Sequence, residues 1–196
     1  MAVIGITGSI ASGKSTFSRM LADRISAEIF DADLEARDLL EFDPDVRREV
    51  VSAMGSEAYN SQGQADRPFI RKRVFSDPEA KARLEGILHP RVRARWMALV
   101  AERSPSAPDL IVDIPLLFET GAESFFDEIV VVACAPEVQL ERLASRGLSQ
   151  EEGKKIIASQ LPVSEKIARS RFVAWNDGSL EILARQVEEL RRCIIH

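Results

Sequence analysis

The sequence contains little cysteine, no excess of positive charge and no long apolar run. Only two of its 196 residues are cysteines, Cys134 and Cys193, which is too few for a disulfide framework. A chain of this length can bury a sizeable core without disulfides, and a reducing compartment fits it. We therefore expect one compact domain, with room for inserted subdomains.

The charge balance and the lack of apolar segments narrow the class of partner. Lys and Arg number 26 against 31 Asp and Glu, for a net charge of −5. Bulk nucleic-acid binding depends on a basic surface, so we expect no nucleic-acid partner. No apolar stretch approaches the length that spans a bilayer, and residues 1–6 lack the features of a signal peptide. We expect a cytoplasmic monomer without a membrane partner.

The N-terminal segment predicts a strand, a helix and a second strand. Residues 3–7 are apolar and rich in β-branched side chains, as in a buried parallel strand. Residues 15–25 repeat apolar side chains at offsets of three and four, which predicts a helix with one buried face. Residues 27–30 predict the next strand, and Asp31 and Asp33 follow it.

The middle of the chain has a helical pattern and no good strand between about residues 34 and 108. Residues 34–40 predict a helix, and Asp43-Pro44 marks a helix start. Three further helices are each expected to begin at a proline, over residues 68–75, 78–88 and 90–102. We therefore expect a helical insertion over residues 43–103 in an α/β core made of residues 1–42 and 104–196.

The last part of the chain returns to an α/β pattern. It predicts a loop over residues 104–108 and strands over residues 110–113, 128–134 and 172–175. Pro136 opens a helix expected to extend to about Arg146, and residues 147–170 are mixed and charged. Residues 179–195 predict a closing helix with an apolar face formed by Leu180, Leu183, Val187, Leu190 and Ile194.

The segment from Gly8 to Ser15 has the form G-x-x-x-x-G-K-S, between a predicted strand and a predicted helix. Glycines let the backbone wrap tightly and turn N–H groups inward, and the following helix directs its positive end at the same place. We expect ATP phosphates to be held here by Gly8, Ala11, Ser12, Gly13, Lys14, Ser15 and Thr16. The Ser15 hydroxyl is also a candidate ligand for Mg²⁺.

Three carboxylates follow predicted strands at the edge of the sheet where the phosphate loop is expected. Asp113 ends an apolar strand, a position that can hold Mg²⁺ through water, although it also fits an ordinary turn residue. Asp33 could accept the proton of an attacking hydroxyl, or could cap the helix that follows. We expect Asp33 to act as the base, and Asp31 to cap or to ligate.

Several segments together resemble the dephospho-CoA kinase family. They are the segment Ile4–Thr16, Asp31-Ala32-Asp33 with Ala36-Arg37, Leu84–Pro90, Asp113–Glu119, the set Gln139, Arg142 and Arg146, and the closing set Gln160, Pro162, Lys166, Asn176 and Gly178. The resemblance implies a P-loop core of the nucleoside-monophosphate-kinase type, with a five-stranded parallel sheet. It also implies a helical CoA-binding insertion, a lid over about residues 142–170, and Asp33 as the base.

The chain departs from the family at two places. Ser9 and Ala11 stand where the family usually has glycine, so we expect Ser9 to tolerate a tight turn without glycine's conformational freedom. Ser170-Arg171 stands where the family tends to have Ala-Asp, close to the expected adenine site.

For the other candidate residues, the sequence fits a purely structural role as well as a role in binding. Arg142 and Arg146 are four apart and expected on one helix face, where they could close over the phosphates or pair with solvent-exposed acids. His89 is expected either to contact the acceptor or to pack at a helix start. The segment Leu117, Phe118 and Glu119 could form a wall against the acceptor, or Leu117 and Phe118 could belong to the core.

The expected reaction transfers phosphate from ATP, with Mg²⁺, to the ribose 3′-hydroxyl of dephospho-CoA. A P-loop kinase acting on a nucleoside or nucleotide is one alternative, and a nucleotide-dependent switch protein that phosphorylates nothing is another. A long acceptor needs a large helical annex, and residues 43–103 could provide it. The chain has no Asn-Lys-x-Asp motif for reading guanine.

Overall fold

The computed structural model describes residues 1–104 and 106–194, and the chain divides into two compact units. The core unit consists of residues 1–31 and 103–196, and the helical unit consists of residues 32–102. The helical unit therefore begins at residue 32, where the sequence placed the boundary after residue 42. Residue 105 of the predicted loop and residue 195 of the predicted closing helix lie outside the described residues.

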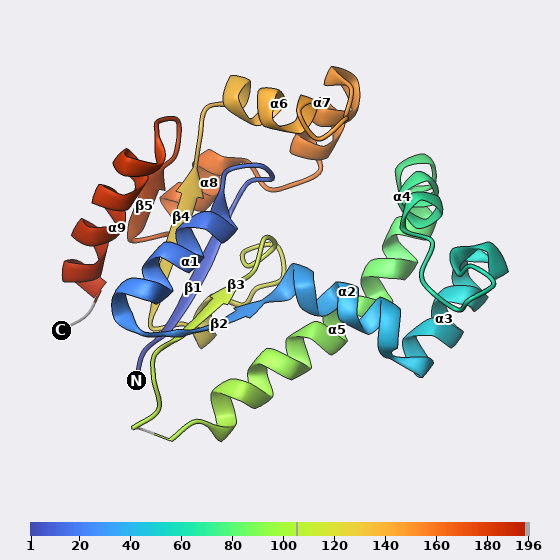
Figure 1. The fold of residues 1–196 in the computed structure, drawn as a ribbon, viewed down its shortest axis with the longest axis horizontal. Helices are drawn as coiled ribbons and strands as arrows, with labels where there is room; N and C mark the ends of the chain where they lie inside the picture. The colour runs from blue at the N-terminus through green and yellow to red at the C-terminus, as the bar shows by residue number, and fades with distance from the viewer. Residues whose placement is uncertain (105, 195–196) are drawn as a thin grey trace. The chain divides into compact units, whose positions relative to one another are not determined.

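The core unit is built on a five-stranded sheet in the order β2-β3-β1-β4-β5, with every paired strand parallel (Figure 1). The strands are β1 (Val3–Gly8), β2 (Glu28–Asp31), β3 (Leu110–Asp113), β4 (Glu128–Ala133) and β5 (Phe172–Trp175). Each lies within one residue of its predicted bounds. Because β1 is central, the loop that follows it emerges at the middle of the carboxyl edge of the sheet.

Two helices cover one face of this sheet. They are α1 (Lys14–Ile25) and α9 (Leu180–Ile194), which pack on each other (Figure 1). Phe17 and Leu21 of α1 join Leu183 and Val187 of α9 in one buried cluster with side chains of β1, β3, β4 and β5. Burial of this apolar surface fixes α1, and hence the loop before it, against the sheet.

The apolar face of α9 is shorter than predicted. Leu183, Val187 and Ile194 are buried, but Leu180 is 60% exposed. Periodicity identifies the face of a helix, but it does not show where along the helix the partner surface begins.

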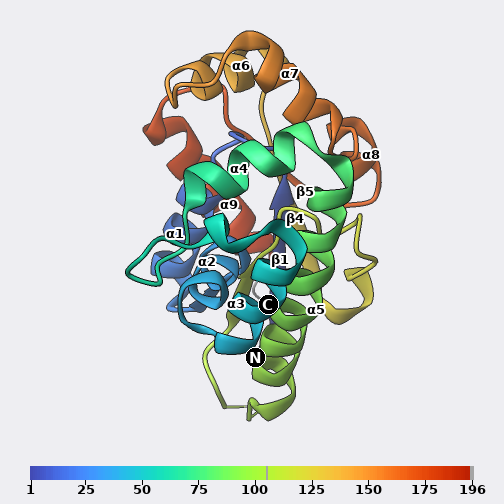
Figure 2. The ribbon, with the colours of Figure 1, turned by 90° about the vertical axis from the view of Figure 1, so that its right-hand side faces the viewer.

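The mixed segment after residue 147 is helical, although the sequence assigned no element to it. The core unit also contains α6 (Pro136–Ala144), α7 (Gln150–Ala158), α8 (Val163–Ala168) and the short 3₁₀ helix η2 (Glu123–Phe125). Ser149 and Glu152 form a capping box at the start of α7, and this S-x-x-E pattern is a helix signal that the sequence does contain. Figure 2 shows α6 and α7 at one end of the core unit.

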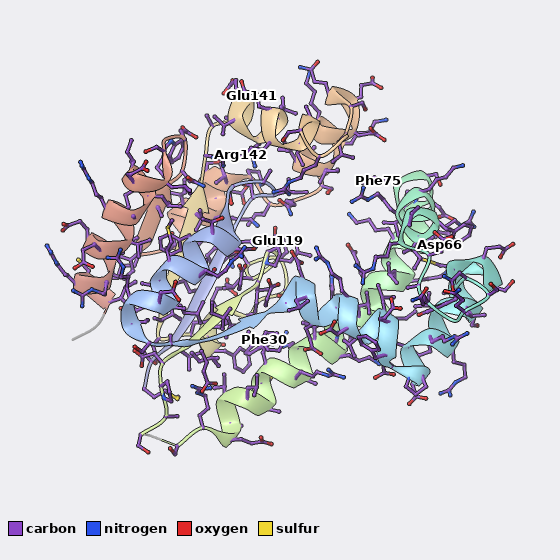
Figure 3. The ribbon with its side chains drawn as sticks, in the orientation of Figure 1. Phe30, Asp66, Phe75, Glu119, Glu141 and Arg142 are labelled. Carbon is purple, nitrogen blue, oxygen red and sulfur yellow. The ribbon has the colours of Figure 1, made fainter. Side chains whose placement is uncertain are left out.

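The helical unit consists of α2 (Ala32–Phe42), α3 (Pro44–Met54), the 3₁₀ helix η1 (Ser56–Ala58), α4 (Arg67–Ser76) and α5 (Pro78–Glu102). Helix α5 contacts α2, α3 and α4. Asp43 caps α3 by accepting hydrogen bonds from the amides of Val46 and Asp45, and these bonds lower the pKa of its carboxyl group. Asp66, labelled in Figure 3, caps α4 through the amide of Phe69. Both caps precede a proline in the first turn, as the sequence indicated for α3.

Helix α5 runs unbroken through Pro90, so the prediction of two helices meeting there is wrong. Proline removes one backbone donor, which normally ends or kinks a helix. Arg91 Nη1 donates to the carbonyl of Ile87 at 2.8 Å, in the turn beside the proline. Val92 and Trp96, both buried, continue the packing beyond it. Tertiary contacts thus outweigh the local tendency to stop.

The edge strand β5 has a side-chain partner on α9. The amide of Trp175 donates to Gln186 Oε1 at 2.7 Å, and Gln186 Nε2 donates back to the carbonyl of Trp175 at 2.8 Å. Gln186 therefore bonds both the amide and the carbonyl of Trp175. Among the described residues, no helix is both long and apolar enough to cross a membrane.

Gly5→Ala tests the packing around the central strand. An added Cβ at Gly5 would lie 2.8 Å from Leu117 Cδ1 and 2.9 Å from Phe126 Cγ, so alanine would overpack the core. We expect the free energy of unfolding to fall by about 1–3 kcal/mol, measured by urea denaturation followed by circular dichroism.

Gly86→Ala is the matched control on the surface of α5. A Cβ at Gly86 would meet no atom within 4 Å. Alanine there should raise the stability of the helical unit by about 0.5–1 kcal/mol, because it loses less conformational freedom on folding than glycine. A Gly5→Ala variant as stable as the parent chain would contradict the packing described for β1.

Candidate functional site

The loop between β1 and α1 begins and ends at two glycines, both with positive φ and both closely approached by other atoms. At Gly8, φ is 156° and an added Cβ would lie 2.1 Å from the carbonyl oxygen of Val132. At Gly13, φ is 90° and a Cβ would lie 2.1 Å from Asn176 Nδ2. The G-x-x-x-x-G spacing therefore reflects a close backbone neighbour at Gly8, and a left-handed backbone with a close side-chain neighbour at Gly13.

Ala11 is the loop residue held in a strained conformation, with φ of 60°. The sequence had assigned the difficulty to Ser9, but Ser9 is not among the non-glycine residues found with positive φ. A left-handed alanine costs about 1–2 kcal/mol relative to a right-handed one. Such strain persists only where surrounding contacts fix the backbone on both sides.

Four side chains from distant parts of the core unit provide those contacts. Gln139 Nε2 donates to the carbonyl of Ile10 at 2.8 Å, and the amide of Ile10 donates to Gln160 Oε1 at 2.8 Å. Arg142 Nη1 donates to the carbonyl of Ala11 at 3.1 Å.

Asn176, just after β5, completes this set. Its Nδ2 donates to the carbonyl of Ser12 at 2.8 Å, and its own carbonyl accepts from Arg142 Nη2 at 2.8 Å. Three consecutive carbonyls of the loop, at residues 10 to 12, are thus bonded to side chains. In a trans peptide the N–H points opposite to the C=O, so the amides of Ala11 and Gly13 face away from these side chains.

The interior of the loop fits an anionic ligand such as a triphosphate. The first amides of α1 have no acceptor within the helix and its dipole is positive at this end, so both favour negative charge. Ser12 Oγ is buried and has no hydrogen-bond partner among the described residues. A phosphate oxygen in the loop would give this hydroxyl a partner, as expected for an anion nest.

Lys14 is buried beneath the loop and paired with Asp113. Lys14 Nζ lies 2.7 Å from Asp113 Oδ1, and Ser18 Oγ donates to Asp113 Oδ2 at 3.1 Å. Asp113 is 2% exposed. Both carboxylate oxygens are therefore engaged by the protein in this structure, and Lys14 has a counter-ion beside the phosphate loop.

The candidate metal ligands are sparse. Ser15 is exposed and Thr16 half-buried in the first turn of α1. Across residues 1–104 and 106–194, no group of three or more His, Cys, Asp or Glu side chains could hold a metal ion. A Mg²⁺ ion here would therefore take most of its ligands from phosphate oxygens and water, as this ion commonly does with nucleotides.

Arg142 and Arg146 do not share a helix face. Helix α6 ends at Ala144, so Arg146 lies in the following turn and is exposed. Arg142 is half-buried and directed at the phosphate loop, whereas its neighbour Glu141 lies on the outer side of α6 (Figure 3). A spacing of four would place both arginines on one face of a continuous helix, but α6 ends two residues before Arg146.

The segment after β3 enters the interior of the core unit at Leu117 and Phe118. Leu117 and Phe118 are 0% and 4% exposed, so the structure places both in the core. Glu119 is engaged by the protein: its Oε1 lies 2.8 Å from Lys166 Nζ and accepts the amide of Leu161 at 3.0 Å. Lys166 is fully buried. Both residues belong to the segments that resemble the family, but nothing in the sequence indicated that they pair.

Two of the expected site residues belong to the helical unit. Asp33 is exposed and is the second residue of α2, directly after β2. His89 is half-buried within α5, next to Pro90, and so does not stand at a helix start. The same unit contains a pocket of about 440 Å³ lined by Met54, Glu57, Phe69, Lys72, Arg73 and Ser76.

Comparison with known proteins points to one family. The family model for dephospho-CoA kinase matches residues 2–181. A dephospho-CoA kinase of Anaeromyxobacter dehalogenans is 42% identical over 97% of this chain and 90% of its own length. The solved dephospho-CoA kinase from Campylobacter jejuni matches with a TM-score of 0.71 and 27% identity, covering 98% of this chain and 96% of that one.

A more distant likeness concerns the fold alone. The solved shikimate kinase from Acinetobacter baumannii has a TM-score of 0.56 at 15% identity, over 100% of this chain and 93% of that one. The predicted α/β fold, a P-loop kinase core with a five-stranded parallel sheet, is confirmed. With the family model matching nearly the whole length, the chain belongs to the dephospho-CoA kinase family.

Proposed function

We propose that this chain transfers the γ-phosphoryl group of ATP to the ribose 3′-hydroxyl of dephospho-CoA, giving ADP and coenzyme A in the last step of coenzyme A biosynthesis. The observation that carries the proposal is the phosphate loop, whose outer carbonyls are bonded to side chains and whose inner amides are left to an anion. The identity of the acceptor comes from the names of the relatives.

On the donor side, the chain binds and orients the triphosphate. The amides of the loop and of the first turn of α1 bind phosphate oxygens, and Lys14 moves from Asp113 toward the β- and γ-phosphates. Arg142 keeps the loop in shape, and Arg146, on the exposed turn after α6, is the arginine available to close over the phosphates. Positioning and charge compensation supply most of the rate in such transfers.

Mg²⁺ is part of the proposal. When bound, the ion would supply positive charge that offsets the charge of the transferring phosphoryl group. The Ser15 hydroxyl is the residue proposed to ligate it, and Asp113 would act through water once Lys14 has turned to the phosphates.

On the acceptor side, Asp33 is proposed as the general base. It follows β2 by two residues, and ligands of such sheets bind at the carboxyl ends of the strands. His89 and the pocket of the helical unit are proposed to contact dephospho-CoA; Lys72 and Arg73 suit its phosphates, and Phe69 its apolar parts. The proposal leaves out Leu117, Phe118 and Glu119, which are buried or paired within the core unit.

We assign the two substrates to different parts of the chain. The helical unit, residues 32–102, would bind the acceptor, and about residues 142–170 would close over the nucleotide as a lid. The proposed partner is the small-molecule acceptor alone, with the chain acting as a cytoplasmic monomer.

Release of ADP, measured with ATP and Mg²⁺, tests the function directly. Dephospho-CoA should stimulate it strongly, and a nucleoside should not. Stimulation by a nucleoside alone would favour another small-molecule kinase. Slow release that no acceptor stimulates would favour a nucleotide-dependent switch protein, and either result would overturn the proposal.

Lys14→Ala removes the cation at the phosphates and leaves Asp113 buried without its partner. We expect the rate of phosphoryl transfer to fall by about 10²- to 10³-fold or more, measured as coenzyme A formation. The exposed Arg185→Ala on α9 controls for loss of one positive charge. A Lys14→Ala enzyme with a near-normal rate would show that the phosphate loop is not the site.

Asp33→Asn removes the proposed base while keeping the size of the side chain. We expect ATP to bind with unchanged affinity by calorimetry, and kcat to fall by about 10²- to 10⁴-fold, because proton transfer contributes this much in typical enzymes. Asp38→Asn, later on α2, removes the same charge from the same helix. Full turnover by the Asp33→Asn enzyme would exclude Asp33 as the base.

A further inference from the structure

The backbone of Ile10 is bonded on both sides by glutamine side chains. We propose that Gln139 and Gln160 are positioning residues that hold the phosphate loop in its nucleotide-binding shape, and so couple it to the α6–α8 segment. The inference rests on the proposed function for its link to turnover, but its central claim concerns nucleotide binding alone.

The direction of each hydrogen bond is fixed by Ile10. Its amide can only donate, so Gln160 must accept through Oε1, and its carbonyl can only accept, so Gln139 must donate through Nε2. At the same residue, therefore, Gln160 acts as a hydrogen-bond acceptor and Gln139 as a donor. A substitution that keeps the acceptor but removes the donor should harm only position 139, whereas a role in packing would make both positions respond alike.

These two bonds set the orientation of neighbouring peptide planes. Gln139 fixes the plane between Ile10 and Ala11, and Arg142 fixes the plane between Ala11 and Ser12. The left-handed φ of 60° at Ala11 lies between two planes that are both fixed. The strain is therefore maintained by contacts from α6, and the amide of Ala11 is directed away from Gln139.

Gln160 fixes the preceding peptide plane, between Ser9 and Ile10. Because the amide of Ile10 donates outward to Gln160, the carbonyl of Ser9 points the other way, where it accepts the amide of Ser12 at 3.2 Å. That bond closes a tight turn from Ser9 to Ser12 within the loop. Losing the acceptor on Gln160 would leave the peptide plane able to flip.

Gln160 itself is anchored to the sheet. The next residue, Leu161, donates its amide to Glu119 at 3.0 Å, and Glu119 is paired with the buried Lys166. Lys166 also donates to the carbonyl of Pro115 at 2.9 Å, two residues after β3. A continuous series of bonds therefore connects the end of β3, through the residues between α7 and α8, to Ile10.

The test compares two substitutions of equal size and charge, Gln139→Glu and Gln160→Glu. A carboxylate at 160 still accepts from the amide of Ile10, whereas a carboxylate at 139 has no proton to donate and faces a carbonyl oxygen. We expect Gln139→Glu to weaken binding of AMP-PNP with Mg²⁺ by about 10- to 100-fold more than Gln160→Glu does, measured by calorimetry at about pH 8.

Lowering the pH should reverse the defect of Gln139→Glu. A protonated carboxyl group regains a donor, and burial of this position, 3% exposed in the structure, favours the protonated form. Affinity should therefore recover at least several-fold between about pH 8 and about pH 6 for Gln139→Glu and change little for Gln160→Glu, relative to the parent chain. A loss due to damaged packing alone would not recover.

The exposed Gln62→Glu, in a turn of the helical unit before α4, controls for an added negative charge and should bind AMP-PNP as the parent does. If Gln139→Glu does not fold, Gln139→Met removes the donor without charge and should weaken binding by about 10-fold.

Equal affinities for the two Gln→Glu variants, no recovery at low pH, or unchanged binding by Gln139→Met would each overturn the inference. These readouts need no acceptor. A parent chain that binds AMP-PNP but does not phosphorylate dephospho-CoA would refute the proposed function and leave the inference standing.

Discussion

The phosphate loop cannot hold its shape alone, and this constraint organises the core unit. To direct amides at an anion, the loop must direct carbonyls the opposite way, and buried carbonyls need donors. Gln139, Arg142 and Asn176 supply those donors, from α6 and from the end of β5. Segments more than a hundred residues away in sequence therefore complete a motif that appears local. The sheet brings them together, because β1 lies between β3 and β4.

Local pattern was enough to predict most of the core unit. Five apolar runs became five parallel strands, and the glycine spacing correctly marked the phosphate loop. The errors arose where tertiary contacts decide the outcome. Pro90 looks like a helix start, but buried Val92 and Trp96 extend the packing past it. Arg146 fits the period of α6, yet the helix ends before it, and a helix end depends on capping and packing more than on period.

The site was predictable only as far as its residue types. The motif predicts Lys14 and Ser15 as site residues, and they remain a prediction. Ala11 rather than Ser9 proved to be strained, because φ depends on which peptide planes are fixed from outside. The pairing of Glu119 with Lys166 joins two segments that no spacing rule connects. Net charge was no guide to the surroundings of this loop: the chain carries a net charge of −5, yet a buried lysine, paired with Asp113, lies beside the loop.

The glutamine on α9 that bonds both backbone groups of Trp175 has a consequence for behaviour at high concentration. An open sheet margin offers a template on which a second molecule can add a strand, and this is a common route to aggregation. With the amide and the carbonyl of Trp175 already occupied, an incoming chain finds no ladder to extend at that point. The short β5 strand is thereby shielded without a charged or proline residue in its own sequence.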